Sequence, residues 1–221
     1  MIHSLFGQEK TMDSSAKVSF HTTYPSKSEP GECAFPLRWV VRPYRGEPFA
    51  YVAAGTPTNW ELPPGTEPRY TLYRTKDTSE PIVVLVARGD LFTALTPDHQ
   101  VLAELRLAPP EQKWRRVHEI VRPKQPLLRA RGATVRSIIK SVLYTPLILI
   151  EFLLCLTDGD IVIDPPTRTA WKTTGGIGNR TALTQRIGSP EYRVYGKHLD
   201  HRIAYAQSVA GLWRVDRADD R

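Results

Sequence analysis

Residues 199–218 read LDHRIAYAQSVAGLWRVDRA and have the periodicity of a helix with one apolar face. Asp200 stands where a helix N-cap is expected, because its carboxylate can accept a hydrogen bond from a backbone N–H of the first turn. The apolar face consists of Ile203, Ala206, Ala210 and Trp213, widened by Leu199, Val209 and Leu212. Alanine, glycine and serine are frequent here, so the backbone of this helix can approach closely whatever surrounds it.

Upstream of this segment the pattern is mostly that of β-strands. RYTLYRTK (69–76) and EYRVYG (191–196) alternate apolar and polar residues, which is typical of half-buried strands. PIVVLVARG (81–89) is a β-branched run that predicts a strand buried on both faces. Many strands followed by one apolar helix predict a mainly β fold, with a barrel-like sheet wrapped around the C-terminal helix.

Two pairs of strands have the spacing of hairpins. LFTAL (91–95) and QVLAELRL (100–107) are separated by TPDH (96–99), whose proline and aspartate suit a tight turn. DIVID (160–164) and TAWKTTG (169–175) follow the same plan around PPTR. Both pairs favour an antiparallel meander.

The first 34 residues have a different composition from the rest of the chain. Residues 1–34 are polar, rich in Ser, Thr, Lys and Pro, and poor in large apolar side chains, so we expect a flexible N-terminal arm. Residues 35–218 are then a single β-rich barrel domain that ends in the helix 199–218. Within it GTPTNWELPPGTEPR (55–69) predicts a long loop, because it holds four prolines and two glycines.

Charge and cysteine content limit the partners and the compartment. Thirty Lys and Arg against 23 Asp and Glu give the 221 residues a net charge of +7, which favours acidic partners. Cys33 and Cys155 are too few for a metal cluster or a disulfide framework, which indicates a reducing, cytoplasmic compartment. The N-terminal residues lack the apolar core of a signal peptide.

The densest charge lies in residues 113–140, where nine basic side chains accompany one acid, Glu119. Such a stretch favours phosphate groups, whether on lipid headgroups or on nucleic acid, where Trp114 could stack on a base. It could equally be the solvated face of ordinary strands. The candidate lipid- or anion-binding residues are Lys113, Arg115, Arg116, Arg122, Lys124, Arg129, Arg131, Arg136 and Lys140.

SVLYTPLILIEFLLCL (141–156) follows this basic stretch directly and is almost continuously apolar. From Ile138 onward the run has 19 residues, near the roughly 20 that span a bilayer as a helix. Lys140 and Glu151 oppose a span, since a charge at its centre costs about 2.5–3.5 kcal/mol, and Pro146 would kink a helix. The segment is therefore predicted to be a core element, with interfacial insertion as the alternative. Its candidate membrane contacts are Leu147, Ile148, Leu149 and Phe152.

No pattern in the sequence indicates a catalytic, metal or cofactor site. The six histidines are scattered, and His198 and His201, three residues apart, lack an obvious third ligand. GGIGNR (175–180) does not have the spacing of a dinucleotide-binding loop, although Asn179 and Arg180 could contact an anion. We expect a protein that is not an enzyme and that uses no metal or cofactor.

The segment SPEYRVYGKHLDHRIAYAQSVAGLW (189–213) resembles the end of the tubby-like fold, which phospholipid scramblases share with LURP-one-related proteins. In that family a final strand leads through a short link into an apolar helix that threads a twelve-stranded barrel. The resemblance places Tyr192, Val194 and Tyr195 in the strand and Ile203 to Trp213 in the helix. The chain lacks the cysteine-rich palmitoylation stretch and the proline-rich arm of animal scramblases, and it has no convincing acidic calcium loop.

The resemblance implies a lipid- or membrane-associated module, since tubby domains bind phosphoinositides through basic surface residues. The leading expectation is a non-enzymatic module that binds anionic phospholipid headgroups from the cytoplasm, at the periphery of a membrane. The alternative is a nucleic-acid-binding or structural assembly protein that uses the same basic surface. The sequence leaves the oligomeric state open.

Overall fold

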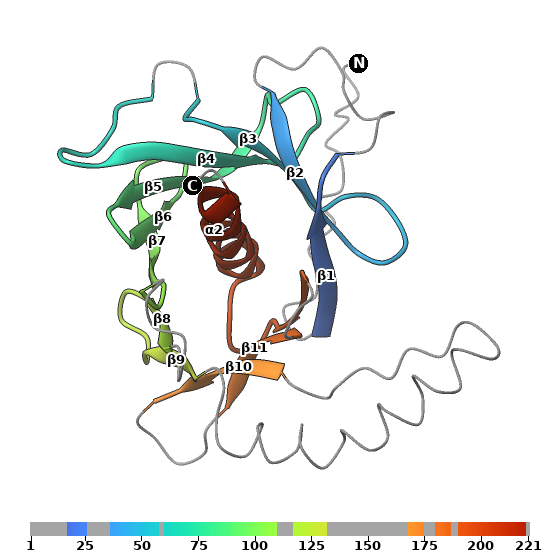
Figure 1. The fold of residues 1–221 in the computed structure, drawn as a ribbon, viewed down its shortest axis with the longest axis vertical. Coiled ribbons are helices and arrows are strands. Elements are labelled where there is room, and N and C mark those ends of the chain that lie inside the picture. The colour runs from blue at the N-terminus through green and yellow to red at the C-terminus, as the bar shows by residue number, and fades with distance from the viewer. Residues whose placement is uncertain are drawn as a thin grey trace, which may run out of the picture.

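Twelve antiparallel strands close into one barrel around a C-terminal helix (Figure 1). The computed structural model describes residues 17–25, 36–57, 60–109, 117–131, 168–174, 180–186 and 190–219, except for the side chains of residues 168 and 214–219. The strands are β1 (Lys17–Thr23), β2 (Leu37–Arg42), β3 (Ala50–Ala54), β4 (Glu67–Tyr73), β5 (Pro81–Arg88), β6 (Leu91–Leu95), β7 (Val101–Arg106), β8 (Val117–Val121), β9 (Leu128–Arg131), β10 (Arg168–Thr173), β11 (Thr181–Arg186) and β12 (Glu191–Tyr195), and the helix is α2 (His201–Asp219). This confirms the mainly β barrel with a C-terminal helix and is consistent with the tubby-like architecture.

Helix α2 runs through the middle of the ring of strands (Figure 1). Every residue from Ile203 to Ala210 is buried, so the helix is surrounded on all sides and not only along one face. Tyr205 packs edge-on against Phe20 of β1, and Trp213 packs edge-on against Phe92 of β6. The aromatic rings thus fill the space between the narrow helix and the barrel wall.

The small residues of α2 set how closely the wall can approach. A Cβ atom at Gly211 would lie 3.3 Å from the hydroxyl oxygen of Tyr192, which is shorter than most contacts that Cβ atoms make in proteins. The buried hydroxyl of Ser208 donates to the carbonyl oxygen of Tyr205 and lies 3.0 Å from the hydroxyl of Thr22 on β1. Small and hydroxyl-bearing residues therefore let the helix fit inside the barrel without leaving Ser208 unpaired.

Asp200 caps α2, as the sequence predicts. Its carboxylate accepts a hydrogen bond from the backbone N–H of Arg202 at 2.8 Å, and also binds the guanidinium of the same residue. A side-chain acceptor at this position satisfies a backbone donor that has no partner inside the helix. The helix therefore begins at the point where the link from β12 ends.

Strand β1 closes the barrel by pairing with β12 on one side and β2 on the other. The prediction of a flexible arm is therefore wrong for residues 17–23. KVSFHTT is mostly polar because only alternate residues face the core, among them Phe20 and Thr22, while the others lie on the outer face. Tyr24 and Pro25 follow β1 and are also described. The rest of the predicted arm, 1–16 and 26–34, lies outside the described residues.

Strand β5 is buried on both faces, which confirms the prediction for its β-branched run. Its inner residues belong to the main core, whereas Val84 and Val86 point outward and pack with Leu95 of β6 beneath Trp60. The indole N–H of Trp60 donates to the carbonyl oxygen of Pro97 at 3.0 Å, and its ring stacks on His99 at 4.3 Å between centroids. The loop between β3 and β4 thus covers this part of the outer wall.

The other strand predictions have mixed outcomes. The hairpin of β6 and β7 and the strands β4, β5, β10 and β12 form as predicted. Strand β10 pairs with β9 and β11, whereas its predicted partner, 160–164, lies outside the described residues. Strands such as β2 and β3 were not predicted. Their short runs, LRWVVR and AYVAA, pair with each other and with the adjacent strands β1 and β4.

Candidate anion-binding surface

Positive charge is concentrated on one half of the barrel. We call the described residues of β8 to β12, β1 and β2, with their links, the basic wall; they are residues 17–25, 36–42, 117–131, 168–174, 180–186 and 190–198. These ranges hold thirteen Lys and Arg against two acids, Glu119 and Glu191. The mixed wall, β3 to β7 with its links (residues 43–57 and 60–109), holds six Lys and Arg against eight acids. Because the strands of each wall are neighbours in the barrel, the asymmetry is spatial as well as sequential.

A row of polar side chains crosses four strands of the basic wall. Arg42 of β2 pairs in register with His21 of β1, and His21 pairs with Glu191 of β12. The row continues to β11, where the Nη1 of Arg186 lies 3.3 Å from the Oε2 of Glu191. Alternation along the strands places these residues outward, because the intervening residues face the core.

Glu191 is the acid in this row and is only 9% exposed. Burial by itself raises the pKa of its carboxyl. Hydrogen bonds from the hydroxyl of Tyr44 and from Arg186, with the positive fields of Arg186 and Arg193, outweigh burial and lower the pKa below its usual value. Glu191 is therefore ionised near neutral pH and forms a fixed negative point among three arginines.

His21 lies beside Glu191 and carries no net charge near neutral pH. Burial and, to a lesser degree, the charge of Arg42 lower the pKa of its imidazole, and Glu191 offsets only part of this effect. Its Nδ1 is buried without a hydrogen-bond partner among the described residues, and its ring lies 5.1 Å from that of Tyr44. The row thus contains a titratable group that can gain a positive charge on acidification.

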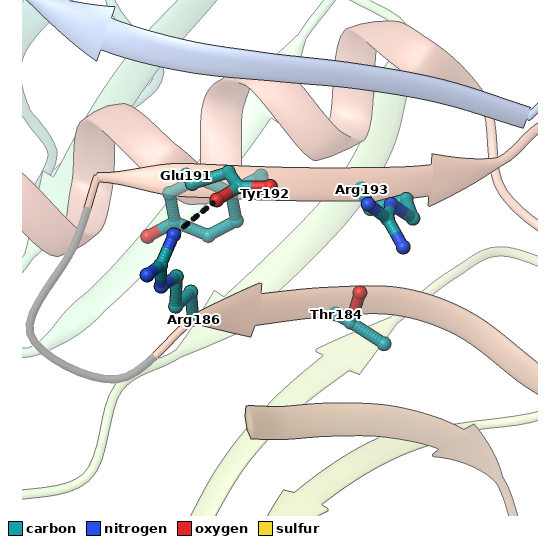
Figure 2. A pocket seen from close by; sticks show the side chains of 5 residues that line it. All are labelled: Thr184, Arg186, Glu191, Tyr192 and Arg193. Atoms are coloured by element: carbon teal, nitrogen blue, oxygen red, sulfur yellow. Dashed lines mark hydrogen bonds and ion pairs between the residues drawn. The ribbon is translucent and has the colours of Figure 1, made fainter. Parts of the chain in front are cut away.

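A shallow hollow lies next to the row, between β11 and β12, where Tyr192 also lines it (Figure 2). Figure 2 shows Arg186 and Thr184 on one strand facing Glu191 and Arg193 on the other. Thr184 and Arg193 are partners in the sheet register, and the Nε of Arg193 donates to the hydroxyl of Ser19 on β1 at 3.1 Å. Two guanidinium groups and a hydroxyl therefore surround an opening on the outer surface.

Three of the residues predicted to bind anions lie on the surface of the basic wall. Arg129 and Arg131 belong to β9, and Lys124 is exposed in the turn before it. The Nε of Arg129 lies 3.1 Å from the Oε1 of Glu119, so part of its charge is neutralised locally. Lys172 of β10, which was not predicted, stands in register beside Arg129 and is exposed.

Arg122 has a different position from the other predicted residues, because it is only 7% exposed. Its guanidinium donates to the carbonyl oxygen of His198 at 2.7 Å and to that of Pro126 at 3.0 Å. Burial lowers the pKa of this guanidinium. Arg122 therefore joins the β8–β9 turn to the link before α2, and we leave it out of the candidate binding surface.

The remaining candidates lie outside the described residues. They are Lys113, Arg115, Arg116, Arg136 and Lys140 of the basic stretch, and Leu147, Ile148, Leu149 and Phe152 of the apolar run 141–156. In the part of the chain that the structure describes, no helix has the length and apolarity needed to cross a membrane. Within the same residues, no three His, Cys, Asp or Glu side chains gather as metal ligands would.

The sequence did not predict the row or the hollow, although one strand that contributes to both has a recognisable pattern. In EYRVY the charged Glu191 and Arg193 alternate with Tyr192 and Val194, which indicates a charged outer face opposite an apolar inner one. The partners from β1 and β2 could not be placed beside them, because residues 17–23 were assigned to an arm. Comparisons with protein-family models, with curated proteins and with solved structures found no match to this chain.

Proposed function

We propose that this protein is a binding module, and not an enzyme, that docks on anionic phospholipid headgroups at a membrane surface through the basic wall. The observation that carries the proposal is the segregation of charge among the described residues: the basic wall holds thirteen Lys and Arg, all but Arg122 candidates for binding, with two acids, and the mixed wall holds six with eight. An unbiased solvated surface would distribute the two signs more evenly.

The electrostatics suit a flat, negatively charged partner. Each Lys or Arg near an anionic membrane contributes about 1 kcal/mol at physiological ionic strength, so several together give stable peripheral binding. The side chains project from a closed, hydrogen-bonded sheet, which presents them as a fixed array. Lys17, Arg131 and Lys172 are exposed members of that array, and Lys124 and Lys197 are exposed in the links beside it.

An aromatic side chain accompanies these charges. Tyr44 is 63% exposed and lies beside His21 at the edge of the basic wall. Tyrosine is enriched at membrane–water interfaces, because its ring is apolar and its hydroxyl can remain hydrated. The combination of a partly apolar ring with surrounding cations is suited to the headgroup region.

Charge reversal on matched positions tests the proposal. The first variant combines Lys124→Glu, Arg131→Glu and Lys172→Glu on the basic wall. The control combines Arg74→Glu, Lys76→Glu and Arg88→Glu on the mixed wall, and therefore has the same net charge. Both are compared with the unaltered chain by flotation on vesicles of neutral lipid with and without an acidic lipid.

We expect the unaltered chain and the control to float with acidic vesicles, and the first variant to bind them about a hundredfold more weakly or worse. Equal binding of the unaltered chain to neutral vesicles would contradict the proposal, as would equal losses in the two variants. Tighter binding to an oligonucleotide than to acidic vesicles, with a steep salt dependence, would identify nucleic acid as the partner instead.

A further inference from the structure

The hollow between β11 and β12 has donors on two sides. Thr184 and Arg193 face each other across the two strands, and Arg186 lies two residues from Thr184 on the same outer face. Diagonal neighbours of this kind have Cα atoms roughly 7–8 Å apart, so the two arginine side chains can reach a common group between them. The threonine hydroxyl adds a third donor from the strand that also holds Arg186.

This set of donors suits a tetrahedral oxyanion better than a planar one. A guanidinium presents parallel N–H groups that match two oxygens of a phosphate, and two guanidinium groups can bind different oxygens of the same group. The hollow is lined by five residues from two neighbouring strands, so we expect it to accept the end of a ligand and not its full length. A phosphomonoester presents three outer oxygens at its end, whereas a phosphodiester presents two and carries a substituent on each side.

Glu191 occupies one corner of the same hollow. Its carboxylate already accepts hydrogen bonds from Arg186 and Tyr44, so it uses part of the positive field that a bound anion would need. An incoming phosphate would share Arg186 with this carboxylate and would be repelled by it. The affinity of the hollow for an anion therefore depends on Glu191.

We infer that Thr184, Arg186 and Arg193 form a site for one phosphomonoester group and that Glu191 is an internal competitor that limits its affinity. This inference deepens the proposed function, on which it rests for the membrane as the source of the phosphate. The chemistry is shared by a lipid whose headgroup ends in a phosphate and by a small soluble phosphomonoester.

Soluble probes test the site apart from any membrane. Glycerol 3-phosphate serves as the monoester and glycerophosphocholine as the diester, each titrated at constant ionic strength and followed by amide chemical shifts. We expect saturable binding of the monoester, with shifts in β11 and β12, and no saturation with the diester. Equal binding of the two probes, or shifts spread over the whole surface, would overturn the inference.

Substitutions in the hollow make the test quantitative. Glu191→Gln should tighten monoester binding about fivefold, because it removes a like charge while keeping the shape of the side chain. Arg193→Gln should weaken it at least tenfold, and Thr184→Val should weaken it severalfold. Arg88→Gln and Thr93→Val, on the outer face of the mixed wall, serve as controls that leave it unchanged. Thermal unfolding of each variant verifies that the barrel is intact, and weaker binding in Glu191→Gln would refute the role given to that carboxylate.

Vesicles then identify the source of the phosphate. Phosphatidate ends in a phosphomonoester and phosphatidylglycerol contains a diester, so the two are compared at matched surface charge. A preference for phosphatidate that is lost in Arg193→Gln would support a lipid ligand. Monoester binding in solution with no binding to either vesicle would support a soluble ligand and reject the proposed function. Binding to both vesicles equally, with no response to soluble monoester, would reject the site and leave the proposed function standing.

Discussion

Strands β5 and β12 both have an apolar inner face, but the outer face of β5 is apolar and covered, whereas that of β12 is charged. Inside the barrel, Leu85 and Val194 both contribute to the core around α2. Outside, Val84 and Val86 of β5 are buried beneath Trp60, whereas Glu191 and Arg193 of β12 lie in a row of charged side chains. The comparison shows that closing the barrel requires only one apolar face per strand. The outer face is then open to two uses: additional packing on the mixed wall, and binding on the basic wall.

A charge placed on the outer face should therefore have very different effects on the two walls. Val84→Asp would bury an unpaired carboxylate under Trp60, and we expect a loss of about 3–5 kcal/mol in the free energy of unfolding. Thr184→Asp on the basic wall, beside Arg186 and Arg193, should change it by less than about 1 kcal/mol. Urea denaturation of both variants measures the difference. Similar losses at the two positions would mean that the outer faces are equivalent.

Removing the cover should expose the apolar outer face of the mixed wall. Trp60→Ala deletes the ring over Val84 and Val86 and the hydrogen bond to the carbonyl of Pro97. We expect the free energy of unfolding to fall by about 2 kcal/mol, since the indole is only partly buried. Leu62→Ala, in the same loop but 40% exposed, is the matched control and should have little effect. Unchanged stability in Trp60→Ala would show that the covering loop contributes nothing to the wall.

The smallest expected effect is a dependence on pH, both of the stability of the fold and of the binding of the basic wall to acidic vesicles. Burial lowers the pKa of His21, on the wall, and of His201, at the start of α2, below the ordinary value of 6.5. Well above pH 6.5 both imidazoles are neutral in the folded and the unfolded chain. As the pH falls below 6.5, the unfolded chain takes up protons first, so the stability of the fold should decline.

Chemical denaturation between pH 7 and pH 5 measures this decline, which should be smaller in a variant with His21→Gln and His201→Gln. Binding to acidic vesicles should change in the opposite direction, because protonated His21 adds a charge between Arg42 and Glu191. A decline in stability that is unchanged in the double variant would assign it to other groups.

The sequence predicted those features that depend on local pattern. The periodicity of residues 199–218 and the position of Asp200 correctly predicted a capped helix, and the β-branched run at 81–89 correctly predicted a strand buried on both faces. Each of these properties follows from neighbours within a few residues. The identity of the cover over β5 did not follow, because Trp60 lies in a loop more than twenty residues earlier.

The row depends on pairings between strands far apart in the sequence, whereas the hollow lies between the consecutive strands β11 and β12, the first of which the sequence did not predict. His21 and Glu191 are adjacent only because β1 pairs with β12, and no local pattern in KVSFHTT shows which strand lies beside it. The density of charge in residues 113–140 indicated a basic surface but could not show that Arg122 turns inward to bind two carbonyl oxygens. A count of charges along the chain cannot distinguish a guanidinium that stabilises a turn from one that faces solvent.

The pairing of β1 with β12 also determines when the barrel can close during synthesis. The strand that closes the ring and the helix that fills it both lie in residues 191–213, which leave the ribosome after β1 to β11. Until then the emerging polypeptide has two unpaired sheet edges and an apolar lining with nothing inside it, a state prone to association with other chains. Nascent chains that end before Glu191 should therefore need protection by chaperones, whereas the emergence of β12 and α2 should allow closure in one cooperative step.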